Sequence, residues 1–191
     1  MIKLDCPLIL ASGSARRKEL LARIIPEYTV EVSDVDEHCS GWPGAIVMTL
    51  SDRKASAVAE KHTDAIVLGA DTLVYNGSVL GKPHTKENAV RMLTKLSGKW
   101  HDVYTGITLI DTRNGRKIRH CEKTRVHFRL LDAAEIEAYA ATEEPLDKAG
   151  AYGIQGAAEA FIDRIEGSYS NVVGLPLAAL TKMFKKLEDG N

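Results

Sequence analysis

Serine hydroxyls and arginine guanidinium groups follow one another in a short segment near the N-terminus. The segment Ser12-Gly13-Ser14-Ala15-Arg16-Arg17 comes directly after an apolar run at residues 8–11 and leads into a stretch with helical periodicity. Small residues let backbone N–H groups approach an anion, and a helix N-terminus attracts negative charge. Forked guanidinium donors match phosphate oxygens. The segment predicts a phosphate site made of Ser12, Ser14, Arg16 and Arg17; a serine-capped helix with two solvated arginines is the alternative.

A carboxylate follows the second apolar run of the chain. Asp71 comes after residues 65–68 and two small residues, so we expect it at the carboxyl end of a central strand. Open α/β sheets bind ligands at that end of their strands. A carboxylate placed there can hold Mg²⁺ or position a water molecule. An aspartate that only closes a turn is the alternative interpretation.

Further charged residues fit the same chemistry. Asp34, Asp36 and Glu37 lie within four residues and repel one another unless they are solvated or hold a cation. Lys54 falls on a helix expected over residues 45–62, and Lys82 falls in a rigid Gly-Lys-Pro turn. Each lysine taken alone is more typical of a solvated surface, and the acids are equally consistent with a solvated loop.

A glycine-rich loop carries two more candidates, Lys148 and Gln155. Residues 147–156 contain three glycines, which suggests that the backbone of the loop comes close to another group. The amide of Gln155 could bind a ligand or simply close its own loop. Together, the candidates supply a phosphate-binding set of hydroxyls and cations and a metal or base set formed by Glu37 and Asp71.

The elements that must position these residues alternate between strands and helices. Asn76-Gly77 predicts a hairpin with a type I′ turn, and Asn114-Gly115 predicts a second, longer hairpin. Hairpins require antiparallel neighbours, so we expect a mixed sheet with helices on its faces, in the α/β class. Strands are expected at residues 8–11, 28–32, 65–68, 73–75, 79–80, 103–110, 117–130 and 160–165. Helices are expected at residues 16–25, 45–62, 85–97, 133–141 and from Pro176 onward.

Composition excludes several classes of protein. The chain has 191 residues, of which 45% are hydrophobic and 27% charged, and its net charge is −1. These values fit one globular domain and argue against a dedicated nucleic-acid binder, which usually carries excess positive charge. The longest nearly apolar run, residues 172–180, is far below the about 18 residues that span a membrane. The three cysteines are widely spaced, as in a cytoplasmic protein with reduced thiols.

The sequence resembles the Maf family of nucleoside triphosphate pyrophosphatases over about residues 8–187. The resemblance rests on eight segments in the family's order, and no single one is decisive. They are residues 10–21, Val35-Asp36-Glu37, Lys54-Ala55, Gly69-Ala70-Asp71-Thr72, Gly81-Lys82-Pro83, residues 144–152, Gln155-Gly156 and residues 172–176.

The resemblance implies one domain over residues 1–191, with two lobes around a cleft on an elongated mixed sheet related to the inosine triphosphatase fold. It implies hydrolysis of dTTP and UTP to the monophosphate and pyrophosphate with a divalent cation, Mg²⁺ or Mn²⁺. Asp71 would be the general base, and Glu37 would bind the metal or position water. Arg16, Thr72 and Gln155 match positions tied to substrate choice, whereas Lys54 and Lys82 would hold phosphates.

Two other functions remain as alternatives. One is an inosine or xanthosine triphosphatase, and the other is a nucleotide-binding regulator of septum formation without turnover. The intact pair Glu37 and Asp71 disfavours the regulator. The expected partner is a small nucleotide rather than nucleic acid or a membrane. A homodimer is the oligomeric state that we consider for the chain.

Overall fold

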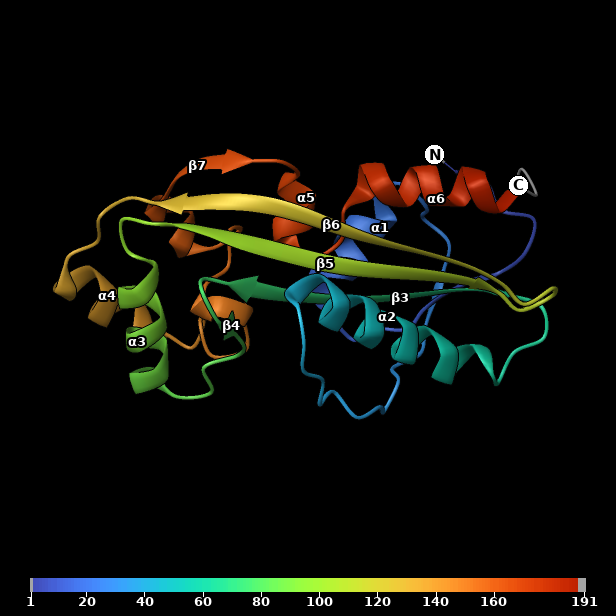
Figure 1. The fold of residues 1–191 in the computed structure, drawn as a ribbon. Coiled ribbons are helices and arrows are strands. Elements are labelled where there is room, and N and C mark those ends of the chain that lie inside the picture. The colour runs from blue at the N-terminus through green and yellow to red at the C-terminus, as the bar shows by residue number, and fades with distance from the viewer. Residues whose placement is uncertain (1, 189–191) are drawn as a thin grey trace. The chain divides into compact units, whose positions relative to one another are not determined.

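Seven strands form one mixed sheet with helices on its faces, so the predicted α/β class is confirmed (Figure 1). The structure is a computed structural model that describes residues 2–188. The strands are β1 (Leu8–Leu10), β2 (Thr29–Val30), β3 (Ile66–Tyr75), β4 (Val79–Leu80), β5 (Trp100–Asp111), β6 (Arg116–Phe128) and β7 (Ile162–Glu166). The helices are α1 (Ala15–Ala22), α2 (Pro43–Ala59), α3 (Lys86–Leu96), α4 (Ala133–Ala140), α5 (Tyr169–Val173) and α6 (Leu177–Glu188), with 3₁₀ turns η1 (Ala149–Ala151) and η2 (Ala157–Phe161).

The strand order is β2-β1-β3-β5-β6-β7, and β4 pairs with β3. β1 is parallel to both β2 and β3, with Leu8 opposite Ile66 and Leu10 opposite Leu68. β4 is antiparallel to β3 and β7 is antiparallel to β6. Crossovers that contain helices connect the parallel strands, and a short turn connects β3 to β4, whereas residues 129–161 with α4 and both 3₁₀ turns connect β6 to β7.

The first hairpin forms as predicted, but its turn is not type I′. Val79 pairs with Tyr75, so the turn has three residues, and Gly77 has φ 67°. A type I′ turn also needs positive φ at Asn76, which is not among the positive-φ residues of the described chain. The connection from β5 to β6 has four residues, and Gly115 N donates to Asp111 O at 2.8 Å.

The expected strand end before Asp71 is wrong, because β3 continues without a break to Tyr75. Its parallel pairing with β1 stops at Leu68, where Leu68 O accepts the N–H of Ala11 at 2.8 Å. β5 lies on the other side of β3 and keeps the chain extended. Asp71 therefore lies within a strand, just beyond the point where β1 ends.

Several helix boundaries follow the local signals. The Thr85 hydroxyl caps α3 by accepting the N–H of Asn88. Asp132 and Glu135 form a capping box at the start of α4. Leu180 and Phe184 are buried on α6. α5 was not predicted, and β7 begins two residues later than expected because η2 precedes it.

The described chain divides into two compact units. The first contains the residues up to Asp71, Thr105–Glu122 and the residues from Gly174 on. The second contains Thr72–Tyr104 and Lys123–Val173. None of the helices within residues 2–188 is long and apolar enough to cross a membrane.

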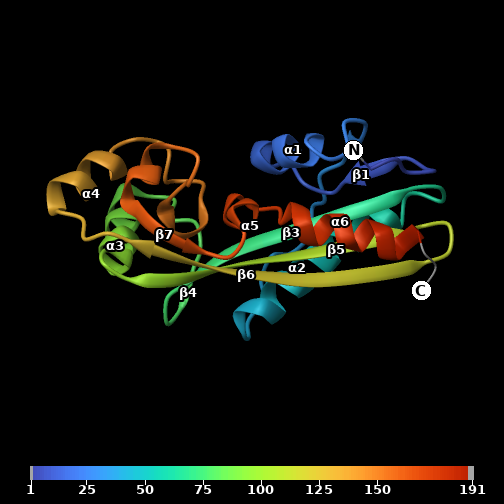
Figure 2. The same cartoon turned by 90° about the horizontal axis from the view of Figure 1, so that it is seen from above.

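In the first unit, α2 covers one face of the sheet while α1 and α6 cover the other (Figures 1 and 2). Two glycines let α2 pack closely. A Cβ at Gly69 would lie 2.2 Å from Ser51 O, and one at Gly106 would lie 2.3 Å from Val47 O. Real Cβ atoms do not approach that closely, so both positions require glycine, and the α2 backbone rests directly on β3 and β5.

The second unit has its own core, in which Phe128 is fully buried. The Phe128 ring packs edge to face against Tyr152 at 4.9 Å and Phe161 at 6.1 Å, as the charge distribution of aromatic rings favours. Tyr152 places the glycine-rich loop on this core. The fold of the loop therefore depends on tertiary contacts rather than on its own sequence alone.

Candidate active site

A lysine ammonium joins two carboxylates in the first unit. Lys54 Nζ lies 2.7 Å from Asp71 Oδ1 and 2.8 Å from Glu37 Oε1. The side chains of Lys54 and Asp71 are only 11% and 13% exposed, whereas that of Glu37 is 61% exposed. Because both carboxylates contact the same nitrogen atom, they lie close enough together for a single cation to bridge them.

The close packing of α2 creates this arrangement. Lys54 is on α2, and Asp71 is on β3 two residues after Gly69. A larger residue at position 69 would push the α2 backbone away from β3. The segment that carries Glu37 is held to the same helix, since Arg53 Nη1 donates to Asp36 O and His38 O, both at 3.0 Å.

The serine-rich turn of the first unit is tightly hydrogen-bonded. Ser12 is 7% exposed, and its hydroxyl oxygen accepts Ser14 N–H at 3.3 Å and Arg17 Nη1 at 3.2 Å. Ser14 caps α1, and its side chain accepts Arg17 N–H at 3.4 Å. The serine-capped helix of the alternative interpretation is therefore present, and a helix start of this kind can also bind an anion through its N–H groups.

The two arginines of this turn have different surroundings. Arg17 Nε donates to Gly174 O at 3.0 Å, so the Arg17 guanidinium links the turn to the segment before α6. Burial lowers the pKa of Arg17, while the carboxylates of Asp71 and Glu37 act in the opposite direction. Arg16 is half-buried and makes no ion pair or side-chain hydrogen bond within residues 2–188. Its donors therefore remain available for a ligand.

The acidic cluster does not act as a unit. Asp36 Oδ1 accepts the backbone N–H of His38 at 2.9 Å and contacts His38 Nδ1 at 2.7 Å, and these contacts lower the pKa of Asp36. Glu37, by contrast, contacts Lys54. Of the three acids that the sequence grouped together, Glu37 is the one that joins Asp71.

The other predicted residues belong to the second unit. Thr72 follows Asp71 in β3, Lys82 is exposed in the turn after β4, and Gln155 is exposed in the glycine-rich loop. The side chain of Gln155 makes no hydrogen bond within the described chain, so it is not the group that closes its loop. The three glycines do make close approaches, to Val74, Lys148 and Glu144.

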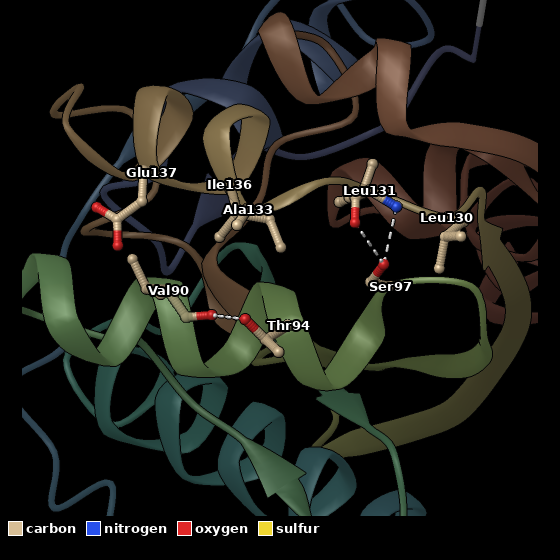
Figure 3. Close-up of a pocket in the computed structure, with 8 residues that line it drawn as sticks. All are labelled: Val90, Thr94, Ser97, Leu130, Leu131, Ala133, Ile136 and Glu137. Atoms are coloured by element: carbon tan, nitrogen blue, oxygen red, sulfur yellow. Dashed lines mark hydrogen bonds between the residues drawn. The ribbon is translucent and has the colours of Figure 1, made fainter.

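A pocket of about 360 Å³ also occurs in the second unit, between α3 and α4 (Figure 3). Val90, Ile136 and the 80% exposed Leu130 give it an apolar lining, and Ser97 bonds to the backbone of Leu131. Glu137 is its only titratable lining residue, and it contains none of the residues predicted to act on phosphates. We therefore place the candidate active site at Lys54, Asp71 and Glu37.

The groups that phosphate-ester chemistry uses are hydroxyls, guanidinium groups and an ammonium beside two carboxylates. Comparison with known proteins defines the class further. The chain belongs to the Maf-like protein family, whose model matches residues 7–187, so the predicted resemblance is confirmed.

Three curated relatives share one name. A protein of Bacillus cytotoxicus is 49% identical over 185 residues, covering 95% of this chain and 96% of its own length. Proteins of Bacillus mycoides and Desulforamulus reducens are 47% and 48% identical, over 95% and 91% of this chain and 95% and 93% of their own lengths. All three are named dTTP/UTP pyrophosphatase, in agreement with the predicted activity.

Proposed function

We propose that this protein is a nucleoside triphosphate pyrophosphatase that hydrolyses dTTP and UTP to the nucleoside monophosphate and pyrophosphate. The observation that carries the proposal is the contact of Lys54 with both Asp71 and Glu37, in a chain about half identical to proteins named for this activity. Modified pyrimidine nucleotides such as pseudo-UTP fit the same site. A nucleotide pool of this kind lies in the cytoplasm, which is the compartment we propose.

The chemistry of the acidic residues fits a divalent cation. No group of three His, Cys, Asp or Glu side chains in residues 2–188 is arranged to hold a metal by itself. Mg²⁺ is commonly held by one or two carboxylates together with substrate phosphates. Asp71 and Glu37 supply such a pair, and phosphate oxygens and water would complete the coordination. When bound, the cation offsets the negative charge of the triphosphate.

Different side chains have different roles in hydrolysis. Asp71 accepts a proton from the attacking water, which is aimed at the α-phosphorus. The bond from the α-phosphorus to its bridging oxygen breaks, and pyrophosphate leaves with that oxygen. Arg16, Lys54 and Lys82 bind the phosphates, while Ser12 and Ser14 shape the turn that presents backbone N–H groups. Arg17 holds Ser12 in place and adds positive charge to this region.

Recognition of the base is assigned to Gln155, with Thr72 as a second residue that affects substrate choice. The exposed amide of Gln155 offers an NH₂ group as donor and a carbonyl oxygen as acceptor. These match the alternating acceptors and donor on the edge of thymine or uracil. Cytosine and adenine present donor and acceptor in the opposite order, so an amide held in one orientation matches them poorly.

A pyrophosphate-release assay tests the proposal. We would measure kcat/KM for dTTP, UTP, CTP, GTP, ITP, XTP and 7-methyl-GTP with Mg²⁺ and with Mn²⁺. The expected order places dTTP and UTP first. Preference for ITP or XTP would indicate an inosine or xanthosine triphosphatase, preference for 7-methyl-GTP would overturn the substrate assignment, and binding without turnover would indicate a regulator.

A further inference from the structure

A carboxylate closes the glycine-rich loop of the second unit. Glu144 Oε1 accepts the hydroxyl of Tyr139 at 3.0 Å, and Glu144 Oε2 accepts the N–H of Ala157 at 3.2 Å. Tyr139 is on α4, before the loop, and Ala157 begins η2, after it. One side chain therefore ties the two ends of residues 144–157 together.

Two glycines of the loop make room for its own side chains. A Cβ at Gly156 would lie 2.0 Å from Glu144 Oε1, so the carboxylate fills the space that a side chain would need. A Cβ at Gly153 would lie 2.9 Å from the Lys148 side chain, whose Nζ donates to Glu144 O at 2.6 Å. Both glycines are thus explained by the closure of the loop around Glu144 and Lys148.

This closure fixes the position of Gln155. Its neighbours are Ile154, which is 4% exposed, and Gly156, which lies against the Glu144 carboxylate. The side chain of Gln155 is exposed and has no hydrogen bond of its own in the described chain. Contacts made by its neighbours therefore fix the backbone position from which its amide extends.

The same loop holds the turn that carries Lys82. Gly150 N donates to Gly81 O at 3.1 Å, and His84 N donates to Leu146 O at 3.3 Å. His84 and Ala151 have φ values of 60° and 63°, which are unfavourable for residues other than glycine. Such backbone strain persists only where surrounding contacts hold it, and it is typical of functional segments.

We propose that Glu144 is a positioning residue that controls pyrimidine selectivity by holding the Gln155 amide in the orientation that matches thymine or uracil. Glu144 touches neither substrate nor reacting atoms; it acts through the closed loop. The inference rests on the proposed function, because selectivity is expressed through the nucleotide that Gln155 recognises.

Variants at position 144 separate this role from a merely structural one. Glu144→Ala removes both acceptors. Glu144→Gln keeps an acceptor for Ala157 N–H, and its NH₂ group can donate to the Tyr139 hydroxyl, which can also act as an acceptor. Glu143→Ala is the matched control, because Glu143 is an exposed neighbouring acid outside this network.

The readout is the ratio of kcat/KM for dTTP to that for CTP, because cytosine presents donor and acceptor in the opposite order to thymine. We expect Glu144→Ala to lower this ratio by about tenfold or more, and Glu144→Gln and Glu143→Ala to keep it within about threefold of the wild type. In a Gln155→Ala background, Glu144→Ala should lower the ratio no further, since both substitutions remove one interaction. Of the three single variants at positions 143 and 144, only Glu144→Ala should show faster amide hydrogen exchange at Ala157 than the wild type.

The outcomes distinguish this inference from the proposed function. A folded Glu144→Ala enzyme with the wild-type ratio, beside a Gln155→Ala enzyme with a lowered ratio, would overturn the positioning role alone. A Gln155→Ala enzyme that keeps the wild-type ratio would overturn base recognition and the positioning role together. If Glu144→Ala fails to fold, Tyr139→Phe removes one of the two hydrogen bonds, and an unchanged ratio in that variant counts against the inference.

Discussion

The ammonium of Lys54 lies 2.7 Å from the carboxylate of Asp71, and both side chains are nearly buried. A buried carboxylate without a cationic partner is costly, so the Lys54 ammonium compensates the charge of Asp71 in this largely buried position. The same ammonium also contacts Glu37, where it offsets the repulsion between the two acids. Lys54 thus compensates the negative charge of the two carboxylates, as a divalent cation bound between them would also do.

Replacing Lys54 should therefore affect both stability and catalysis. We expect Lys54→Met to lower the free energy of unfolding by about 1–3 kcal/mol, because a largely buried charge loses its partner. We expect kcat/KM for dTTP to fall by more than about tenfold. Lys61→Met is the control: Lys61 pairs with Glu31 but is 60% exposed, so its loss should change stability by less than about 0.5 kcal/mol. Urea unfolding and steady-state kinetics measure both effects, and equal losses in the two variants would contradict this account.

The two neighbouring arginines should respond differently to the same substitution. Arg16→Lys removes a forked donor that no group within residues 2–188 uses, so it should raise KM for dTTP and leave stability nearly unchanged. Arg17→Lys breaks contacts to Ser12 and Gly174, so it should lower the melting temperature by several degrees. Thermal unfolding and KM would be measured on both enzymes. A lower melting temperature for Arg16→Lys than for Arg17→Lys would reverse the assignment.

Local signals predicted much of the fold, because caps and hairpins depend on nearby residues. Thr85 and Asp132 cap helices where the sequence places them. The type I′ turn at Asn76 and the strand end before Asp71 were wrong. Small residues before Asp71 resembled a turn, but pairing between β3 and β5 keeps them extended. Sheet neighbours cannot be inferred from such a short segment.

The candidate site could be predicted as a set of residues but not as an arrangement. Lys54 lies 17 residues from both Glu37 and Asp71 along the chain, and the three meet because α2 packs directly on β3. Gly69 and Gly106 permit that packing, although nothing in their local sequence indicates it. The role that we propose for Glu144 was also not predicted. The available signal was Gly156, next to Gln155. A glycine at a close approach indicates that another group occupies the space a side chain would need.

Close packing of α2 gives a prediction about Gly69. A Cβ at this position would overlap Ser51 O and approach Ala55, and backbone atoms cannot move aside as a flexible side chain can. Gly69→Ala should lower the free energy of unfolding by about 3 kcal/mol. Gly81→Ala is the control, because a Cβ at Gly81 meets nothing within 4 Å. Urea unfolding measures both, and a Gly69→Ala protein as stable as the wild type would contradict the packing described.

His101 should make stability depend on pH. The residue is 3% exposed, its Nε2 lies 2.8 Å from the Tyr152 hydroxyl, and burial lowers its pKa to about 3 from an ordinary value of 6.5. Below pH 6.5 the unfolded chain binds a proton here that the folded protein does not. Stability therefore falls as pH falls, by about 1.4 kcal/mol from this residue between pH 8 and pH 5.5.

Urea unfolding at several pH values measures this contribution. His101→Gln should remove it and flatten the slope, whatever its effect on absolute stability. His38→Gln is the control, because the His38 side chain is 99% exposed and should leave the slope nearly unchanged. Equal slopes for the wild type and His101→Gln would show that another group is responsible.

Asp71 is the residue on which turnover should depend most strongly. Asp71→Asn keeps the size of the side chain but removes its basicity, so kcat should fall by about two orders of magnitude or more. Asp36→Asn is the matched control, because Asp36 lies beside Glu37 in sequence but faces His38. Near wild-type turnover is expected for that control. Circular dichroism would establish that both variants are folded.

Hydrolysis of dTTP in water labelled with heavy oxygen tests the central claim most directly. Attack at the α-phosphorus, prepared by Asp71, places the label in dTMP and releases one unlabelled pyrophosphate for each dTMP. Mass spectrometry of the products of the wild-type enzyme with Mg²⁺ should give this result, and Asp71→Asn should form the same products far more slowly. Label in pyrophosphate, or release of orthophosphate with dTDP, would contradict the account.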